Sequence, residues 1–293
     1  MAMKKKHNGL WTTLFIGPHM VLFLLFFLVP AVFGIYVSFT DWDLYGTPKW
    51  VGFENFKEIL FDSNSIYHTQ FFNGAKNTIL FVIFTVPLCV IVPLALATML
   101  HAKPKLYKLF QSLFYIPTLF AVSAVMLIWG FLLSLSYGPL PKWFGLKVDI
   151  ASTQPWAWIA LVLITVWWCI GQNLIIYVAA LGGVPTEQIE AAKIDGAGNF
   201  MIFRKILMPN IRFQLFFTTV TTTIAQFNVY GQPLMLTNGG PNNSTRVLMM
   251  DIQQNAFGSG VPAAGMASAM AVLLGLVIMV VSLIQFIAMR KQD

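Results

Sequence analysis

The chain has 293 residues, of which 57% are hydrophobic and only 10% are charged, and its mean hydropathy is +0.73. Soluble domains carry about 25% charged residues, so this composition excludes an ordinary water-soluble globular protein. The 18 Lys and Arg against 11 Asp and Glu give a net charge of +7.

Six long stretches of the sequence contain no Asp, Glu, Lys or Arg. Each could cross a hydrocarbon core, for which a helix needs about 20 apolar residues. We therefore predict an all-α, polytopic membrane protein with six transmembrane helices. In chain order the stretches are 12–39, 78–100, 112–135, 155–181, 213–236 and 264–289.

The first stretch follows three lysines, a pattern that it shares with secretory signal peptides. Its apolar run is about twice the usual length of a signal peptide core, and no small-x-small cleavage site follows. We therefore expect a retained helix.

The distribution of basic residues predicts the orientation in the membrane. With the N-terminus in the cytoplasm, twelve Lys and Arg and four acids lie inside, against six Lys and Arg and seven acids outside. The positive-inside rule then places both termini in the cytoplasm. The basic charge is thus explained by topology and by attraction to anionic lipid, and a nucleic-acid partner is not expected.

The segment between the first two spans, residues 40–77, is predicted to be an external loop. Its apolar residues Phe53, Phe56, Ile59 and Leu60 are spaced as one face of a short helix. Two interpretations remain open for this helix, namely a position on the membrane surface and a docking surface for an external partner.

The fourth and fifth spans carry an unusual number of uncharged polar and aromatic side chains. Residues four apart lie on the same face of a helix. Trp168 and Gln172 form one such pair, and Thr222 and Gln226 form another. Such groups are costly in hydrocarbon unless they are paired or hydrated, which indicates a hydrated pathway, although they could also join helices. The predicted substrate-binding residues are Trp168, Gln172, Asn173, Thr222, Gln226, Asn228 and Tyr230.

The loop between these spans, residues 182–212, contains the most specific pattern. Pro185 and Thr186 suit a helix start, and Gly196 or Gly198 can end that helix in a left-handed conformation. We expect a helix of two or three turns, a bend, and a second helix that reaches Pro209. Small residues beside a carboxylate allow a partner to approach closely and to pair with the charge.

The spacing in this loop resembles the E-A-A motif of the integral membrane subunits of binding-protein-dependent ABC importers. The matching residues are Glu190, Ala191, Ala192, Gly196, Ile206 and Pro209, and Met208 replaces the usual Leu. Segments 38–40, 51–56, 194–197, 236–241 and 244–245 resemble the sugar permeases related to the larger membrane subunit of the maltose importer.

This resemblance implies a type I ABC importer permease architecture. It divides the chain into a first helix plus external loop (1–77), a five-helix permease core (78–289) with the coupling loop 182–212, and a cytoplasmic tail (290–293). It also implies that ATPase coupling is carried by Glu190, Ala191, Ala192, Asp195 and Gly196.

The partners implied are a second homologous permease, expected to form a heterodimer, two ATP-binding subunits and an extracytoplasmic solute-binding protein. The implied location is the inner membrane of a prokaryote. The chain itself is expected to bind no cofactor, because ATP and magnesium belong to the partner ATPase.

The residues favour the same function independently. Spans without charge offer no ion-coupling carboxylate, and the sequence has no phosphate-binding G-x-x-x-x-G-K-[ST] run. We therefore predict a non-catalytic permease for a neutral carbohydrate, driven by a separate ATPase.

Two alternatives stay open. One is the same architecture with a charged solute, such as a glycerol phosphate ester or a polyamine; the other is a membrane-embedded enzyme, for which the spans offer no obvious nucleophile and base.

Cys89 and Cys169 both lie in spans and indicate no disulfide, and four scattered histidines indicate no metal site.

Overall fold

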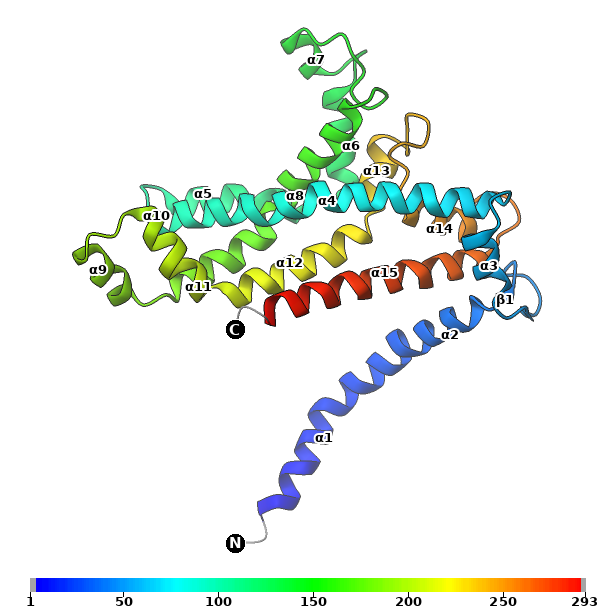
Figure 1. Cartoon of the computed structure of the whole chain (residues 1–293), viewed down its shortest axis with the longest axis horizontal. Coiled ribbons are helices and arrows are strands. Elements are labelled where there is room, and N and C mark those ends of the chain that lie inside the picture. Colours follow the sequence, from blue (N-terminus) through cyan, green and yellow to red (C-terminus); the bar gives the residue numbers. More distant parts are fainter. Residues whose placement is uncertain (1–3, 291–293) are drawn as a thin grey trace. The chain divides into compact units, whose positions relative to one another are not determined.

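The computed structural model describes residues 4–290, with side chains over 13–289, and this part of the chain is mostly helical (Figure 1). The first half contains α1 (Lys4–Phe23), η1 (Leu24–Leu28), α2 (Val29–Val37), β1 (Thr40–Asp41), β2 (Lys49–Trp50), α3 (Glu54–Phe61), α4 (Ile66–His101), α5 (Tyr107–Tyr115), η2 (Ile116–Leu119), α6 (Val122–Leu133) and α7 (Pro139–Phe144). The second half contains α8 (Trp156–Gly182), α9 (Thr186–Ile194), α10 (Asn199–Ile202), η3 (Phe203–Leu207), α11 (Met208–Asn210), α12 (Arg212–Phe227), α13 (Gly231–Leu236), α14 (Leu248–Phe257) and α15 (Ala264–Arg290).

The backbone forms two compact units. One contains the residues up to Phe71 together with Asp251–Gly275, and the other contains Phe72–Met250 and the residues from Leu276 onward. The predicted division at residues 77 and 78 is a functional one and stays a prediction. The predicted tail, 290–293, lies outside the described residues except for the backbone of Arg290.

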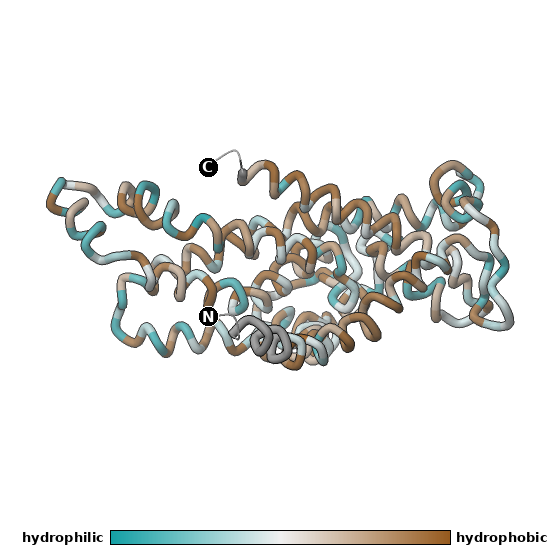
Figure 2. The backbone as a smooth tube through the Cα atoms, turned by 90° about the horizontal axis from the view of Figure 1, so that it is seen from below, coloured by the Kyte–Doolittle hydropathy of each residue, from teal (hydrophilic) through white to brown (hydrophobic). Residues whose placement is uncertain are grey.

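Four helices of the described chain are long and apolar enough to cross a membrane, and a bent pair makes up to five. The four are Thr13–Val37, Ile66–His101, Trp156–Gly182 and Ala264–Met289. Figure 2 shows hydrophobic residues along α15 and more hydrophilic residues around α9. Four of the six predicted stretches therefore lie in such helices, whereas the number six and the cytoplasmic termini stay predictions.

The predicted third stretch, 112–135, is not one straight helix. The chain turns by 98° between Tyr107–Leu119 and Val122–Leu133. Pro117 lies in the short 3-10 helix η2, and Phe120 and Ala121 after it are extended. Proline removes a helical donor and clashes with the preceding turn, which explains why α5 does not continue into α6.

The predicted fifth stretch, 213–236, is also interrupted. α12 ends at Phe227 and α13 begins at Gly231, so residues 228–230 are not helical. With 16 residues, α12 is about 24 Å long at 1.5 Å per residue, which is less than the hydrocarbon thickness.

The predicted external loop is shorter than expected, because α4 begins at Ile66 instead of near residue 78. The hydroxyl of Ser65 accepts from the N–H of Tyr67 at 3.1 Å and so supports the helix start. The predicted stretch begins only after Lys76, because it is defined by the absence of charge. A lysine is compatible with a helix, however, so α4 extends through this residue.

The short helix predicted around residues 53–60 is confirmed as α3, but its buried side chains are Asn55 and Ile59, whereas Phe53 is exposed. The amide of Asn55 donates to the carbonyls of Ser38 and Thr40, at 2.9 Å each. α15 begins against the same place, where the carbonyl of Thr40 leaves no room for a Cβ at Gly265.

Among the candidate membrane spans α8 is the most buried, with Leu174, Tyr177 and Leu181 fully enclosed. Its first half packs with α6 and its second half with α4 and the segment after α9. These contacts hold α8 in place. The polar residues of the fifth predicted stretch lie next to it.

Candidate functional site

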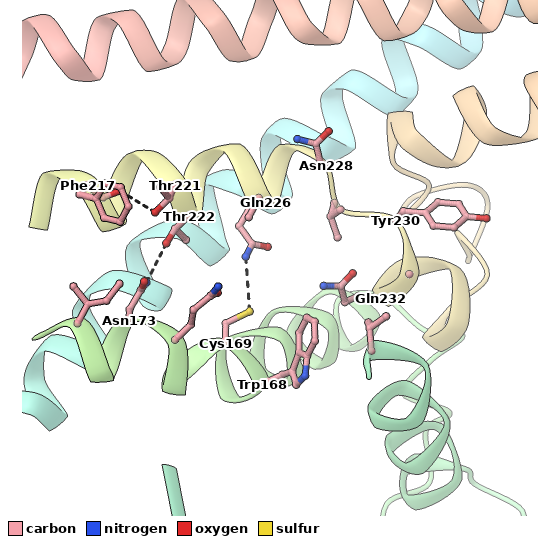
Figure 3. Close-up of a pocket in the computed structure, with 16 residues that line it drawn as sticks. Trp168, Cys169, Asn173, Phe217, Thr221, Thr222, Gln226, Asn228, Tyr230 and Gln232 are labelled. Carbon is pink, nitrogen blue, oxygen red and sulfur yellow. Dashed lines mark hydrogen bonds between the residues drawn. The ribbon is translucent and has the colours of Figure 1, made fainter. Parts of the chain in front are cut away.

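A pocket of about 490 Å³ lies between α8, α12 and the non-helical segment 228–230 (Figure 3). All seven residues predicted to bind substrate line it, so the structure brings them together. The nine further lining residues are Val122, Cys169, Ile176, Phe217, Thr221, Ala225, Val229, Gly231 and Gln232.

The pocket lining is uncharged. Its 16 described residues include no Asp, Glu, Lys, Arg or His. The polar groups are amides, hydroxyls, a thiol and the Trp168 indole, which can hydrogen-bond a neutral polyol but cannot neutralise a charged one.

Asn173 joins three helices at the wall of this pocket. Its Nδ2 donates to the Thr222 hydroxyl of α12 at 3.0 Å and to the Cys89 carbonyl of α4 at 2.8 Å. Further along α8, the Tyr177 and Thr218 hydroxyls lie 2.6 Å apart. The amide donors of Asn173 are thus used within the protein, which makes its position primarily a structural one.

Gln226 has only a weak hydrogen-bond partner within the protein. Its side chain is buried, and its Nε2 approaches only the Cys169 sulfur, at 4.0 Å. Because sulfur is a poor acceptor, a ligand hydroxyl offers this amide a better hydrogen bond. Gln172 is exposed and lines the pocket, one helical turn after Trp168 in α8.

Asn228 and Tyr230 come from the non-helical segment. The Nδ2 of Asn228 donates to the Ile224 carbonyl at 2.8 Å, and Figure 3 shows the Tyr230 ring directed away from Gln226. Gln232 is buried and lines the pocket, and its place shortly after Gln226, Asn228 and Tyr230 is the sequence signal for it.

Trp168 is held in place by the bend between α5 and α6. Its Nε1 donates to the Phe120 carbonyl at 3.0 Å, and its own carbonyl accepts from the Thr118 hydroxyl at 2.8 Å. A Cβ added at Gly171 would lie 2.6 Å from the Thr118 oxygen and 2.9 Å from the Tyr115 Cα. Sequence reasoning missed Thr118 and Gly171, because the contact joins residues about 50 positions apart.

Trp167, the neighbour of Trp168 in α8, does not line this pocket. It packs edge-on against Trp129, with ring centroids 5.6 Å apart, in a separate apolar cavity of about 440 Å³.

The helix predicted in the loop 182–212 is present as α9, which begins after Pro185, and Gly196 has the left-handed φ of +81°. The second predicted helix follows as α10, η3 and α11, up to Asn210. Ile189 and Ala192 pack against the core formed with Ile202 and Leu207. This packing determines which side of α9 is free.

The free side carries Glu190, Ala191 and Asp195, which are all exposed. Two large apolar residues beside them, Ile194 and Phe200, are 87% and 73% exposed. Sequence reasoning did not select these two, although hydrophobic residues within a charged loop are the signal of a contact surface.

Among the residues that the structure describes, no group of three or more His, Cys, Asp or Glu could hold a metal ion.

Comparisons with known proteins give consistent matches. Residues 59–293 match the family model described as "binding-protein-dependent transport system inner membrane component". The chain is 32% identical to the probable starch degradation products transport system permease protein AmyD of Thermoanaerobacterium thermosulfurigenes, over 100% of this chain and 99% of the relative.

Two other matches concern a phosphate ester and an acidic polysaccharide. The sn-glycerol-3-phosphate transport system permease protein UgpA of Rhizobium meliloti is 29% identical over 92% of each chain. A crystal structure of a bacterial alginate ABC transporter with its alginate pentasaccharide-bound periplasmic protein superimposes with a TM-score of 0.77, at 20% identity, over 97% of this chain and 95% of that one.

Proposed function

The chain belongs to the family of binding-protein-dependent transport system inner membrane components, and from this premise we propose that it conducts a neutral carbohydrate across the inner membrane of a prokaryote. As a member of this family it is the permease component of an ABC importer. The observation that carries the choice of cargo is the uncharged lining of the pocket between α8 and α12.

The pocket chemistry supports a polyol. A sugar presents hydroxyl groups to amides such as Gln172 and Gln226, and an apolar ring face to an aromatic side chain such as Trp168. The name of AmyD specifies starch degradation products, which have this chemistry. We therefore propose an oligosaccharide derived from starch as the first substrate to test.

The second candidate cargo is a glycerol phosphate ester, favoured by the similarity to UgpA. Such a dianion is normally bound by Arg, Lys or aligned backbone N–H groups. The 16 lining residues offer no cationic side chain, so we rank this cargo second.

We propose that α9 transmits the work of ATP hydrolysis. Its exposed Glu190 and Asp195 offer charges to a partner, Ala191 allows close approach, and Ile194 and Phe200 offer apolar contacts. The family motif at Glu190, Ala191, Ala192 and Gly196 supports the assignment, and Asp195 lies next to it in the similar segment 194–197. ATP and magnesium are then bound by partner subunits, and this chain is not an enzyme.

The proposed assembly contains a second permease, two ATP-binding subunits and a solute-binding protein. The alginate transporter superimposed here was crystallised with a periplasmic protein, which is consistent with such a partner. Six spans and cytoplasmic termini complete the proposed topology, with the first span as a peripheral helix and the other five as the permease core.

The test is uptake by the complex that co-purifies with the tagged chain, reconstituted in proteoliposomes with its binding protein. We expect ATP-dependent uptake of maltodextrins and none of sn-glycerol 3-phosphate. Uptake of sn-glycerol 3-phosphate alone would replace the first proposal by the second, and ATP-independent uptake of either would contradict both.

A further inference from the structure

A second groove, of about 670 Å³, borders the first half of α12 and shares no lining residue with the substrate pocket. It is formed by the start of α12, the segment η3–α11 and the last turns of α15. Its lining consists of Arg204, Met208, Pro209, Arg212, Phe213, Leu215, Phe216, Thr219, Gln285, Ala288 and Met289.

The rim of the groove is cationic. Arg204 comes from η3 and Arg212 from the first turn of α12, and both side chains are exposed. The described residues that line the groove include no Asp or Glu. Two guanidinium groups facing one groove attract an anion with several oxygen acceptors, such as a phosphate diester.

The rest of the groove is mainly apolar. Phe213 and Phe216 of α12 face Ala288 and Met289 of α15, and the Phe216 and Phe286 rings lie 6.1 Å apart. At the inner end the Gln285 amide donates to the Thr223 hydroxyl at 2.9 Å and links the two helices. The groove thus changes from charged to apolar along its length.

The surroundings are those of a lipid-facing surface. Close to the groove Phe213, Phe286 and Ile287 are all about half exposed or more, and α15 is a candidate membrane span with little of its surface buried. Side chains of this kind contact acyl chains when the helix lies in a bilayer. Basic pockets between membrane helices bind the headgroups of anionic lipids.

We propose that this groove binds one anionic phospholipid. The headgroup phosphate lies between Arg204 and Arg212, and an acyl chain follows Phe213, Phe216 and Met289. A soluble phosphate would use the arginines alone and leave the apolar part of the groove empty. The inference does not depend on which solute the permease carries.

The experiment is native mass spectrometry of the full-length chain, purified in detergent and supplied with phosphatidylglycerol or phosphatidylcholine. We expect one retained phosphatidylglycerol and no retained phosphatidylcholine. The variant Arg204→Ala with Arg212→Ala should lower retention about tenfold or more, because both charges act on one headgroup.

Two control variants distinguish a specific lipid-binding site from non-specific electrostatic attraction of anionic lipid. Lys103→Ala with Lys105→Ala removes two exposed charges outside the groove and should leave retention unchanged. Ala288→Trp keeps every charge but fills the apolar part, and should lower retention as the double arginine variant does.

Four results would overturn the proposal. Equal losses in the two double variants would mean non-specific attraction, and unchanged retention in Ala288→Trp would mean that no chain enters the groove. Displacement of the lipid by inorganic phosphate at equal concentration would identify a soluble anion site. Unchanged retention in the double arginine variant would mean that the two charges do not hold the headgroup.

Discussion

The Thr118 hydroxyl donates a 2.8 Å hydrogen bond to the backbone carbonyl of Trp168, and the same oxygen accepts from the Gly171 N–H at 3.2 Å. One side chain at the α5–α6 bend therefore contacts α8 on both sides of a turn. Trp168 lines the pocket, so the bend and the pocket wall form one structural unit.

Gly171→Ala tests this contact. The added methyl group meets Thr118 and Tyr115 at distances below normal van der Waals contact, and we expect a loss of stability of about 1–3 kcal/mol from overpacking. The measurement is the thermal unfolding midpoint of the purified chain. Gly182→Ala, in the same helix with no atom within 4 Å of the added Cβ, is the control, and equal midpoints for both variants would contradict the assignment.

Gln226→Leu tests the binding role of the pocket. Loss of one hydrogen bond to a ligand costs about 1–1.5 kcal/mol, so we expect uptake at low substrate concentration to fall about tenfold while the complex still assembles. Gln172→Leu should act in the same direction. Gln253→Leu, an exposed glutamine that does not line the pocket, should transport normally; normal uptake by both pocket variants would move the site elsewhere.

Asn173 is expected to act on stability more than on substrate affinity, since its donors are already used. A double-mutant cycle of Asn173→Ala with Thr222→Val should give a coupling of about 0.6 kcal/mol, and at most about 1.7, as for other hydrogen bonds between membrane helices. Unfolding in detergent mixtures measures it. Additive single effects would mean that the 3.0 Å contact contributes nothing.

Glu190→Lys and Ile194→Ser test the free side of α9. Both should weaken attachment of the ATP-binding subunits and lower substrate-stimulated ATP hydrolysis several-fold, because a charge or an apolar contact at the interface is lost. Glu54→Lys reverses a charge on the exposed face of α3 and should leave attachment unchanged. Co-purification of the subunits with the tagged chain is the readout, and full attachment in both α9 variants would refute the coupling role.

Asn77→Leu tests how the turn-rich segment after α13 is held. The Asn77 amide donates to the carbonyls of Asn243 and Arg246, at 2.9 and 2.8 Å, whereas Asn73 donates a single bond of 3.1 Å to Asn243. Leu at 77 leaves two acceptors without this donor and should make the segment more sensitive to protease than Asn73→Leu does. The reverse order of sensitivity would contradict this account.

Much of this structure could be predicted from the sequence where the signal is local. Charge-free runs identify α4, α8 and α15, and the Pro185 to Gly196 pattern identifies α9 with its left-handed end. Helical spacing also grouped Trp168 with Gln172, and Thr222 with Gln226, and all four line one pocket.

The structural features that the sequence did not predict are of two kinds. Some depend on contacts between residues far apart in the sequence, and others are helix interruptions that leave no trace in the hydropathy pattern. Residues 228–230 are no more polar than the helix before them, so hydropathy gives no signal for the end of α12 at Phe227. Thr118 and Gly171 are ordinary in their own segments and become significant only where α5 and α8 meet. The exposed Ile194 and Phe200 resemble core residues until the packing of α9 shows which side is free.

The break at residues 228–230 also bears on hydration. Peptide groups that leave a helix at membrane depth require water or protein as partners, and these three residues border the pocket. If the proposed cargo is correct, a sugar at these residues would exchange water for peptide groups as hydrogen-bonding neighbours and would not enter hydrocarbon. On that proposal, the interrupted helix would lower the free-energy cost of dehydrating a polyol.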